Sequence, residues 1–171
     1  DRCGAPLHAF PAITASVCNL RPTSRGTVTP RSRDPLDKPV IRPNYLSTEE
    51  DRRVAADAIR LTRRIMAAPA MAAHSPEEFR PGPQVQSEGE LVGAAGDLGT
   101  TIFHPVGTCR MGPDGDVTAA VDPRLRLRGI RGLRVADASV MPSITSGNTN
   151  SPVIMIAEKA ADMIRAERRQ G

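Results

Sequence analysis

A Ser-x-x-Glu sequence at residues 47–50 constrains the fold most strongly, because it predicts where the clearest helix begins. In such a capping box, Ser47 caps the helix and the Glu50 side chain reaches back to the backbone N–H of the cap. Apolar residues then follow at helical spacing and form one stripe: Val54, Ala58, Leu61 and Ile65. Because proline cannot continue a helix, Pro69 is expected to stop it. A helix is therefore predicted between Ser47 and Pro69.

Two further helices are predicted from the same kind of signal. A second capping box, Ser87 with Glu90, indicates a short helix over residues 88–97. Near the end of the chain, Ser151 is expected to cap a helix whose first position is Pro152. The expected buried stripe of this last helix is Val153, Ile156, Ala157, Ala160 and Ile164.

Short runs of β-branched and apolar residues indicate strands between the helices. Residues 9–20 are expected to form a strand that turns at 21–26 and returns over 27–32. Further short strands are expected at Val40–Ile41, 100–104, Leu125–Leu127 and Leu133–Ala136. Short strands mixed with helices place the chain in the α+β class.

The core is expected to be thin, because the chain has only four aromatic residues. They are Phe10, Tyr45, Phe79 and Phe103 among 171 residues. Apolar residues make up 39% of the chain, so it is not expected to be disordered as a whole. Two explanations stay open: the core is packed from aliphatic side chains, or the chain packs against something else.

The net charge of +4 does not by itself indicate nucleic-acid binding. The aromatic residues that would stack on single strands are scarce, and no zinc-finger or RNA-binding signature is present. Solvated helix faces and strand edges explain the arginines better. The arginine-rich runs are Arg52–Arg53, Arg63–Arg64, Arg124 to Arg134, and Arg165 to Arg169.

The cysteines and the apolar runs bear on location and on metals. Cys3, Cys18 and Cys109 form no CxxC pair, and an odd number of cysteines favours reduced thiols in the cytoplasm. No apolar run has the length of a membrane span, and the sequence shows no signal-peptide pattern. His104 and Cys109 are too few ligands for zinc, so no metal is expected, and His8 and His74 are expected in loops or at the surface.

Three motifs in the second half resemble one family of flavoenzymes. They are HPVGTCRMG (104–112), VDPRLRLRGIRGLRVADASVMP (121–142) and SGNTNSPVIMIAEKAADMI (146–164). In this order and spacing they resemble the C-terminal part of the glucose–methanol–choline oxidoreductases, and most of all the choline dehydrogenase-like branch. Residues 20–28 and 41–54 are also similar to the substrate domain of that family.

The resemblance implies a division of the chain. Residues 1–103 would belong to the substrate-binding domain, an antiparallel sheet with helices. Residues 104–112 would form the catalytic motif at the domain interface, and residues 113–171 would complete the FAD-binding α/β domain. The GxGxxG loop that cradles the FAD pyrophosphate is absent from these 171 residues. We therefore expect an N-terminal FAD-binding segment as a partner, either lost by truncation or carried by another polypeptide.

The resemblance also implies two catalytic side chains. His104 matches the histidine that takes the hydroxyl proton of an alcohol, a task that suits an imidazole. Asn148 matches a position that holds histidine or asparagine, and its amide would stabilise developing alkoxide charge. The alternatives from the residues alone are a hydrogen-bonded core histidine and a turn asparagine beside Gly147.

Four residues would contact the cofactor FAD if the resemblance holds. Asp137 and Ala138 match a segment whose backbone lies at the ribityl–phosphate region, although a turn at a strand end also explains them. Asn150 and Ser151 would lie near the flavin ring, where a helix N-terminus stabilises the negative charge of reduced flavin. The predicted function is hydride transfer from a small-molecule alcohol to FAD. The alternative is a non-catalytic α+β binding module that has lost its FAD-binding half.

Overall fold

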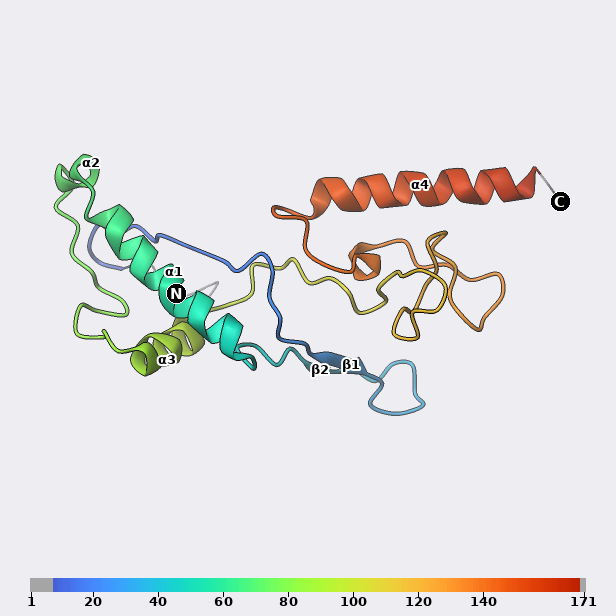
Figure 1. Cartoon of the computed structure of the whole chain (residues 1–171), viewed down its shortest axis with the longest axis horizontal. Helices are drawn as coiled ribbons and strands as arrows, with labels where there is room; N and C mark the ends of the chain where they lie inside the picture. The colour runs from blue at the N-terminus through green and yellow to red at the C-terminus, as the bar shows by residue number, and fades with distance from the viewer. Residues whose placement is uncertain (1–7, 170–171) are drawn as a thin grey trace. The chain divides into compact units, whose positions relative to one another are not determined.

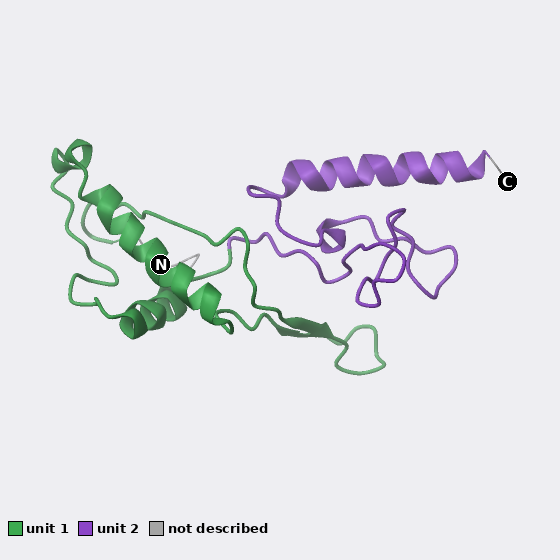
Figure 2. Ribbon diagram, in the orientation of Figure 1, with its two compact units in different colours: residues 1–101 green, residues 102–171 purple. Residues whose placement is uncertain are grey.

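The structure is a computed structural model that describes residues 8–169, so Cys3 lies outside the described residues. The chain divides between Thr101 and Ile102 into two compact units, called unit 1 (residues 1–101) and unit 2 (residues 102–171) (Figure 2). Unit 1 contains a two-stranded sheet and three helices, whereas unit 2 contains loops, one 3₁₀ turn and one long helix (Figure 1). The mixture agrees with the expected α+β class.

The sheet of unit 1 pairs β1 (Thr27–Thr29) with β2 (Val40–Arg42) in antiparallel fashion. Val28 lies opposite Ile41, and the N–H of Asp37 donates to the Asp34 carbonyl in the connecting loop. The strand predicted over 9–20 is wrong: these residues carry no strand and are mostly exposed. The physical reason is that β1 pairs with the later strand, which follows it after a ten-residue loop closed by its own turn.

The long helix α1 (Glu49–Met66) begins one residue later than the capping box predicted. Thr48 is the cap, and its hydroxyl accepts the Asp51 N–H at 3.2 Å. The predicted Ser47–Glu50 box is therefore wrong. The backbone N–H of Ser47, which the Glu50 side chain was expected to accept, donates instead to the Ser24 hydroxyl at 3.0 Å. A contact across 23 residues has moved the helix start.

The second capping box is confirmed at α3 (Glu88–Leu98), where Ser87 and Glu90 satisfy each other's backbone N–H groups. Helices α1 and α3 pack against each other, with Ala56 and Leu91 fully buried. The apolar stripe predicted for α1 is only partly covered, because Leu61 and Ile65 are 44% and 54% exposed. The short helix α2 (Pro69–Ala72) follows, with Pro69 at its first turn.

The buried carboxylate of Asp51 ties the N-terminus of α1 to the segment before β1. It is 5% exposed and accepts the backbone N–H groups of Thr23 at 2.9 Å and Ser24 at 2.8 Å. Asn19 adds a side-chain hydrogen bond at 3.2 Å. Burial opposes the charged form, but the hydrogen bonds from Ser24 and Thr23 outweigh it, so the pKa of Asp51 is lowered. These bonds explain why the extended segment 19–24 lies along α1.

Replacing Asp51 by asparagine is expected to destabilise unit 1 by about 1–3 kcal/mol, because an amide NH₂ would face a backbone N–H. The lowered pKa means that Asp51 contributes its stability above the ordinary value of 3.8 and loses it as the pH falls below that value. Urea unfolding followed by circular dichroism should show the difference at neutral pH, and the difference should shrink as the pH falls below 3.8. Asp57→Asn, on the exposed face of α1, is the control; equal midpoints for both variants would contradict the assigned role.

The core of unit 2 is built from aliphatic side chains packed beneath α4 (Asn150–Arg168). Its buried members are Val121, Leu125, Val140, Met141, Ile156 and Ala160. The predicted strands at 100–104, 125–127 and 133–136 are wrong, since no strand forms there. Arg126, Leu127 and Arg134 take part only in isolated bridges. The 3₁₀ turn η1 (Ala138–Val140) completes this core. A small aliphatic core explains the scarcity of aromatic residues.

Helix α4 begins two residues earlier than predicted. Thr149 is the cap, so Ser151 and Pro152 occupy the second and third helical positions. Ile156 and Ala160 of the predicted stripe are buried, but Ala157 is exposed. The helix packs Ile156 and Ala160 against the core of unit 2, whereas Ile154 and Met155 are each 56% exposed.

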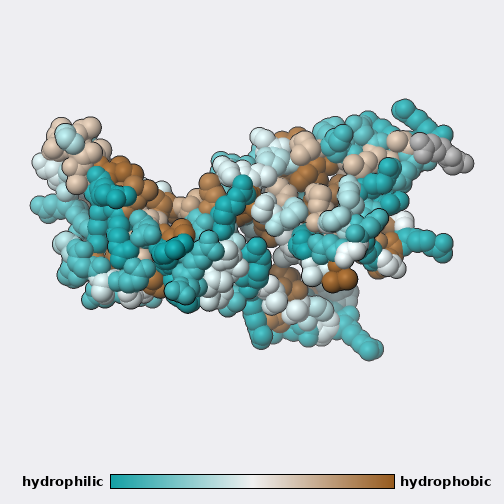
Figure 3. All heavy atoms as spheres, viewed as in Figure 1, coloured by the Kyte–Doolittle hydropathy of each residue, from teal (hydrophilic) through white to brown (hydrophobic). Residues whose placement is uncertain are grey.

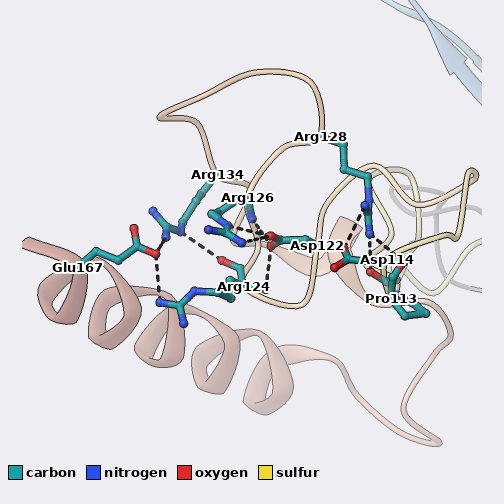
Figure 4. Close-up of polar contacts among 9 residues, drawn as sticks. Pro113, Asp114, Asp122, Arg124, Arg126, Arg128, Arg134 and Glu167 are labelled. Carbon is teal, nitrogen blue, oxygen red and sulfur yellow. Dashed lines mark hydrogen bonds and ion pairs between the residues drawn. The ribbon is translucent and has the colours of Figure 1, made fainter. Parts of the chain in front are cut away.

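Ion pairs fasten these loops to α4 (Figure 4). Glu167 near the end of the helix contacts Arg124 at 3.0 Å and Arg134 at 2.6 Å, and hydrogen bonding to Arg134 lowers the pKa of its carboxyl. Arg126 pairs with Asp122 at 2.7 Å. Arg124 and Arg134 thus join the loops of unit 2 to α4, whereas Arg126 pairs within its own loop.

Candidate functional site

The motif of residues 104–112 lies beside η1. The N–H of Cys109 donates to the Ser139 carbonyl at 3.0 Å, and the N–H of Met111 donates to the Val140 carbonyl at 2.8 Å. Two of the motifs found in the sequence are thus joined by backbone hydrogen bonds. These bonds attach the motif to the segment that forms η1 in the core of unit 2.

The backbone around His104 is strongly restricted. Phe103 has φ +65°, a left-handed conformation that is uncommon for residues other than glycine. Pro105 restricts His104 itself, because the residue before a proline avoids the helical region. Gly107 follows with φ +86°, and a Cβ there would stand 3.5 Å from the Met141 carbonyl oxygen. Residues on both sides therefore direct the half-buried imidazole.

The imidazole of His104 meets a side chain from α4. Its Nδ1 lies 3.0 Å from Oγ1 of Thr149, the cap residue of that helix. Thr149 is 7% exposed, so this hydrogen bond is shielded from water. The contact joins the first and the third of the sequence motifs. It leaves Nε2 as the nitrogen of His104 that is not directed at Thr149.

Thr149 is the partner of His104 that the sequence reasoning missed. The predictions chose its two neighbours, Asn148 and Asn150, and passed over the threonine between them. A partial signal was present: with Pro152 at the third helical position, one of the two N–H groups that a cap hydroxyl usually accepts is missing, although the N–H of Ser151 remains.

Asn148 lies immediately before this cap and its side chain is exposed. Its φ angle is outside the left-handed region, whereas Ser146 has φ +40°. The unusual backbone conformation of the loop is therefore located at Ser146 and not at Asn148. This observation weakens the alternative in which Asn148 is present only to permit a turn.

The other predicted contact residues lie on two elements of unit 2. Asp137 caps η1 by accepting the Ser139 N–H at 2.7 Å, and Ala138 packs against the core. Asn150 and Ser151 are exposed in the first turn of α4. The carboxylate of Asp137 is thus engaged in its own turn, which leaves the backbone of this segment as the part that could face a ligand.

The N-terminus of α4 has an unusual electrostatic character. Its first turn carries no acidic side chain and no side-chain cap, whereas α1 has three acidic residues in its first turn. The partial positive charge of the helix N-terminus is therefore not neutralised by the helix itself. Such an end favours a negatively charged or electron-rich group next to Asn150 and Ser151.

Metal ligands, membrane-spanning helices, hollows and further cysteine or histidine contacts are the other features that bear on function. No group of three or more potential metal ligands is present among residues 8–169. No helix in that part of the chain is long and apolar enough to cross a membrane. A hollow of about 620 Å³ is lined by loop residues between Asp114 and Gly132, away from His104 and Asn148. Cys18 and Cys109 are unpaired; His8 stacks on Phe10 and His74 is exposed.

Comparison with known proteins gives one family. The family model described as GMC oxidoreductase matches residues 22–157, a range that includes every predicted site residue. The alcohol dehydrogenase [acceptor] of Pseudomonas putida is 49% identical over 151 residues, which are 88% of this chain and 27% of that protein. The mitochondrial choline dehydrogenase of Homo sapiens is 47% identical over 91% of this chain and 26% of its own length.

A solved structure is similar as well. An FAD-dependent oxidoreductase from Chaetomium thermophilum has a TM-score of 0.81 and 34% identity, covering 88% of this chain and 26% of that one. The chain thus spans about a quarter of the length of the proteins that it matches.

Proposed function

The chain belongs to the GMC oxidoreductase family, and on that premise we propose that it is the C-terminal portion of an FAD-dependent enzyme that oxidises a small-molecule alcohol. The observation that carries the proposal is the contact of His104 with the cap of α4. It places a restrained imidazole beside a helix N-terminus that has neither an acid nor a side-chain cap. The names of the relatives support an alcohol as the substrate class.

In this proposal two side chains of unit 2 have separate roles in the oxidation of the alcohol. Nε2 of His104 takes the hydroxyl proton while the carbon–oxygen bond of the alcohol becomes a carbonyl. Asn148 donates an amide hydrogen bond to the substrate oxygen as negative charge develops on it. When bound, FAD accepts the hydride from the alcohol carbon.

The residues at the start of α4 fit a flavin. Backbone N–H groups of Asn150 and Ser151 are available as donors, and no carboxylate in the first turn repels a reduced, negatively charged ring. The backbone at Asp137 and Ala138 would contact the ribityl–phosphate part of the cofactor. The backbone N–H groups at the start of α4 are therefore suitable hydrogen-bond donors to bound FAD.

We propose further that a segment outside these 171 residues carries the GxGxxG loop. Residues 113–171 would complete the FAD-binding domain with that segment, residues 1–103 would form part of the substrate-binding domain, and 104–112 would lie at their interface. Figure 3 shows hydrophobic surface on both units. Among the exposed apolar residues of unit 2 are Ile102, Ile130 and Ile154. Such surface suits burial against another segment. The unpaired Cys18 and Cys109 favour the cytoplasm, which stays a prediction.

A chimera tests the proposed function directly. The 151 matched residues of the Pseudomonas putida alcohol dehydrogenase would be replaced by the corresponding residues of this chain. We expect a yellow, flavin-loaded protein whose flavin is bleached by an alcohol under anaerobic conditions. A flavin-loaded chimera that no alcohol reduces would contradict the oxidoreductase function and favour a non-catalytic module.

The chain without such a segment is expected to bind FAD weakly or not at all, because it has no phosphate-binding loop. Titration with FAD, followed by quenching of flavin fluorescence, measures this, with the chimera as the positive control. Stoichiometric binding at micromolar concentration would show that the 171 residues suffice for the cofactor.

A further inference from the structure

The hydroxyl of Thr149 does not do what the hydroxyl of a cap residue usually does. A cap threonine normally accepts a hydrogen bond from the N–H of the second or third helical residue. Thr48 does so at the start of α1, where its Oγ1 accepts the Asp51 N–H at 3.2 Å. Thr149 occupies the same position in α4, yet its side chain makes no such bond.

Two features of the start of α4 explain the difference. The first is the backbone of Thr149, which has helical angles (φ −88°, ψ −3°), whereas Thr48 has the extended angles usual for a cap (φ −97°, ψ 153°). The second is the third helical position. That position is Pro152, which has no N–H, whereas the third position of α1 is Asp51. The hydroxyl of Thr149 is thereby released from its local partner. Its backbone carbonyl still begins the helix by accepting the Val153 N–H at 3.0 Å, so the residue stays in place.

The released hydroxyl meets Nδ1 of His104 at 3.0 Å in a shielded position. We infer that Thr149 is a positioning residue, whose Oγ1 accepts the Nδ1–H of His104 and so fixes the neutral tautomer with its lone pair on Nε2. The opposite direction, with the hydroxyl donating to Nδ1, would leave a proton on Nε2. Only the first arrangement gives an imidazole whose outward nitrogen accepts a proton.

The choice of this hydrogen-bond direction rests on the proposed function, because a base needs a lone pair on its outward nitrogen, but the measurement of the tautomer does not need that function. The tautomer can be read in the 171-residue chain without flavin, by ¹⁵N NMR of the histidine rings in alkaline buffer, where imidazoles are neutral. The chain has only three histidines, His8, His74 and His104. A His104→Gln variant assigns the signals of His104, and the other two rings serve as internal references.

Three variants test the role of the hydroxyl. In the parent chain and in Thr149→Ser, the His104 signals should show a protonated Nδ1 and an unprotonated Nε2. In Thr149→Val, which keeps the shape and removes the hydroxyl, the Nε2-protonated form should become the major one. Thr48→Val removes the other cap hydroxyl and should leave the tautomer of His104 unchanged. Amide spectra and circular dichroism establish that α4 persists in each variant.

Two results would overturn the inference: a parent chain in which Nε2 of His104 carries the proton, or a folded Thr149→Val variant with the parent tautomer. In the flavin-loaded chimera, Thr149→Val should slow flavin reduction by roughly 10–100-fold with little change in KM, as when an orienting partner of a histidine is lost. Thr149→Ser should restore the rate. If His104→Gln leaves flavin reduction unchanged, the proposed function fails, whereas the NMR result stands by itself.

Discussion

Replacing His104 by alanine is expected to lower the rate of flavin reduction in the chimera by roughly 10²–10⁴, the usual contribution of a positioned acid–base group. The imidazole of His104 follows Phe103, which has a left-handed backbone, and it contacts Thr149, the cap residue of α4. Without it, the hydroxyl proton has no acceptor at the moment when the hydride leaves. Anaerobic stopped-flow spectroscopy measures the bleaching of the flavin directly, and substrate affinity should change much less than the rate.

His74→Ala is the matched control for this substitution, because His74 is exposed and belongs to unit 1. Its flavin-reduction rate should equal that of the parent. The FAD content of both variants must be checked, since a loss of cofactor would imitate a loss of chemistry. A rate for His104→Ala within about threefold of the parent, far below the expected range, would reject His104 as the base.

Replacing Asn148 by alanine is expected to slow flavin reduction by roughly 10²–10³, the typical cost of removing one donor to a developing oxyanion. The side chain is exposed beside the cap of α4, where a substrate oxygen can approach it. Asn148→His should retain more activity than Asn148→Ala, because imidazole also donates a hydrogen bond. The same stopped-flow experiment gives the rates of both variants.

A turn-only role for Asn148 makes the opposite forecast, in which Asn148→Gly is nearly neutral and Asn148→His is inactive. The structure gives glycine no advantage there, because the left-handed residue of this loop is Ser146. Glycine should therefore behave like alanine. A glycine variant with parental activity would make Asn148 a structural residue and remove it from the catalytic site.

The helices show where local sequence was sufficient and where it failed. The box at Ser87 and Glu90 was predicted correctly because both partners lie within one turn and no distant group competes for them. The capping box predicted at Ser47 and Glu50 has the same Ser-x-x-Glu sequence but does not form. The Ser47 N–H donates to the hydroxyl of Ser24 instead. The helix signals as a whole gave α1, α3 and α4 to within a few residues, but the strands predicted in unit 2 did not form.

The sequence by itself indicated the family, the helices α1, α3 and α4, and His104 as the residue to examine, because motifs and caps depend on neighbours within a few positions. Only the tertiary structure decided that β1 pairs with β2, that Leu61 is exposed, and that His104 meets Thr149 across 45 residues. Such contacts depend on how the aliphatic core brings η1, the motif and α4 together. Hydrogen bonds between distant residues form only when that packing has brought them within reach, so no local pattern at Thr149 could specify its partner.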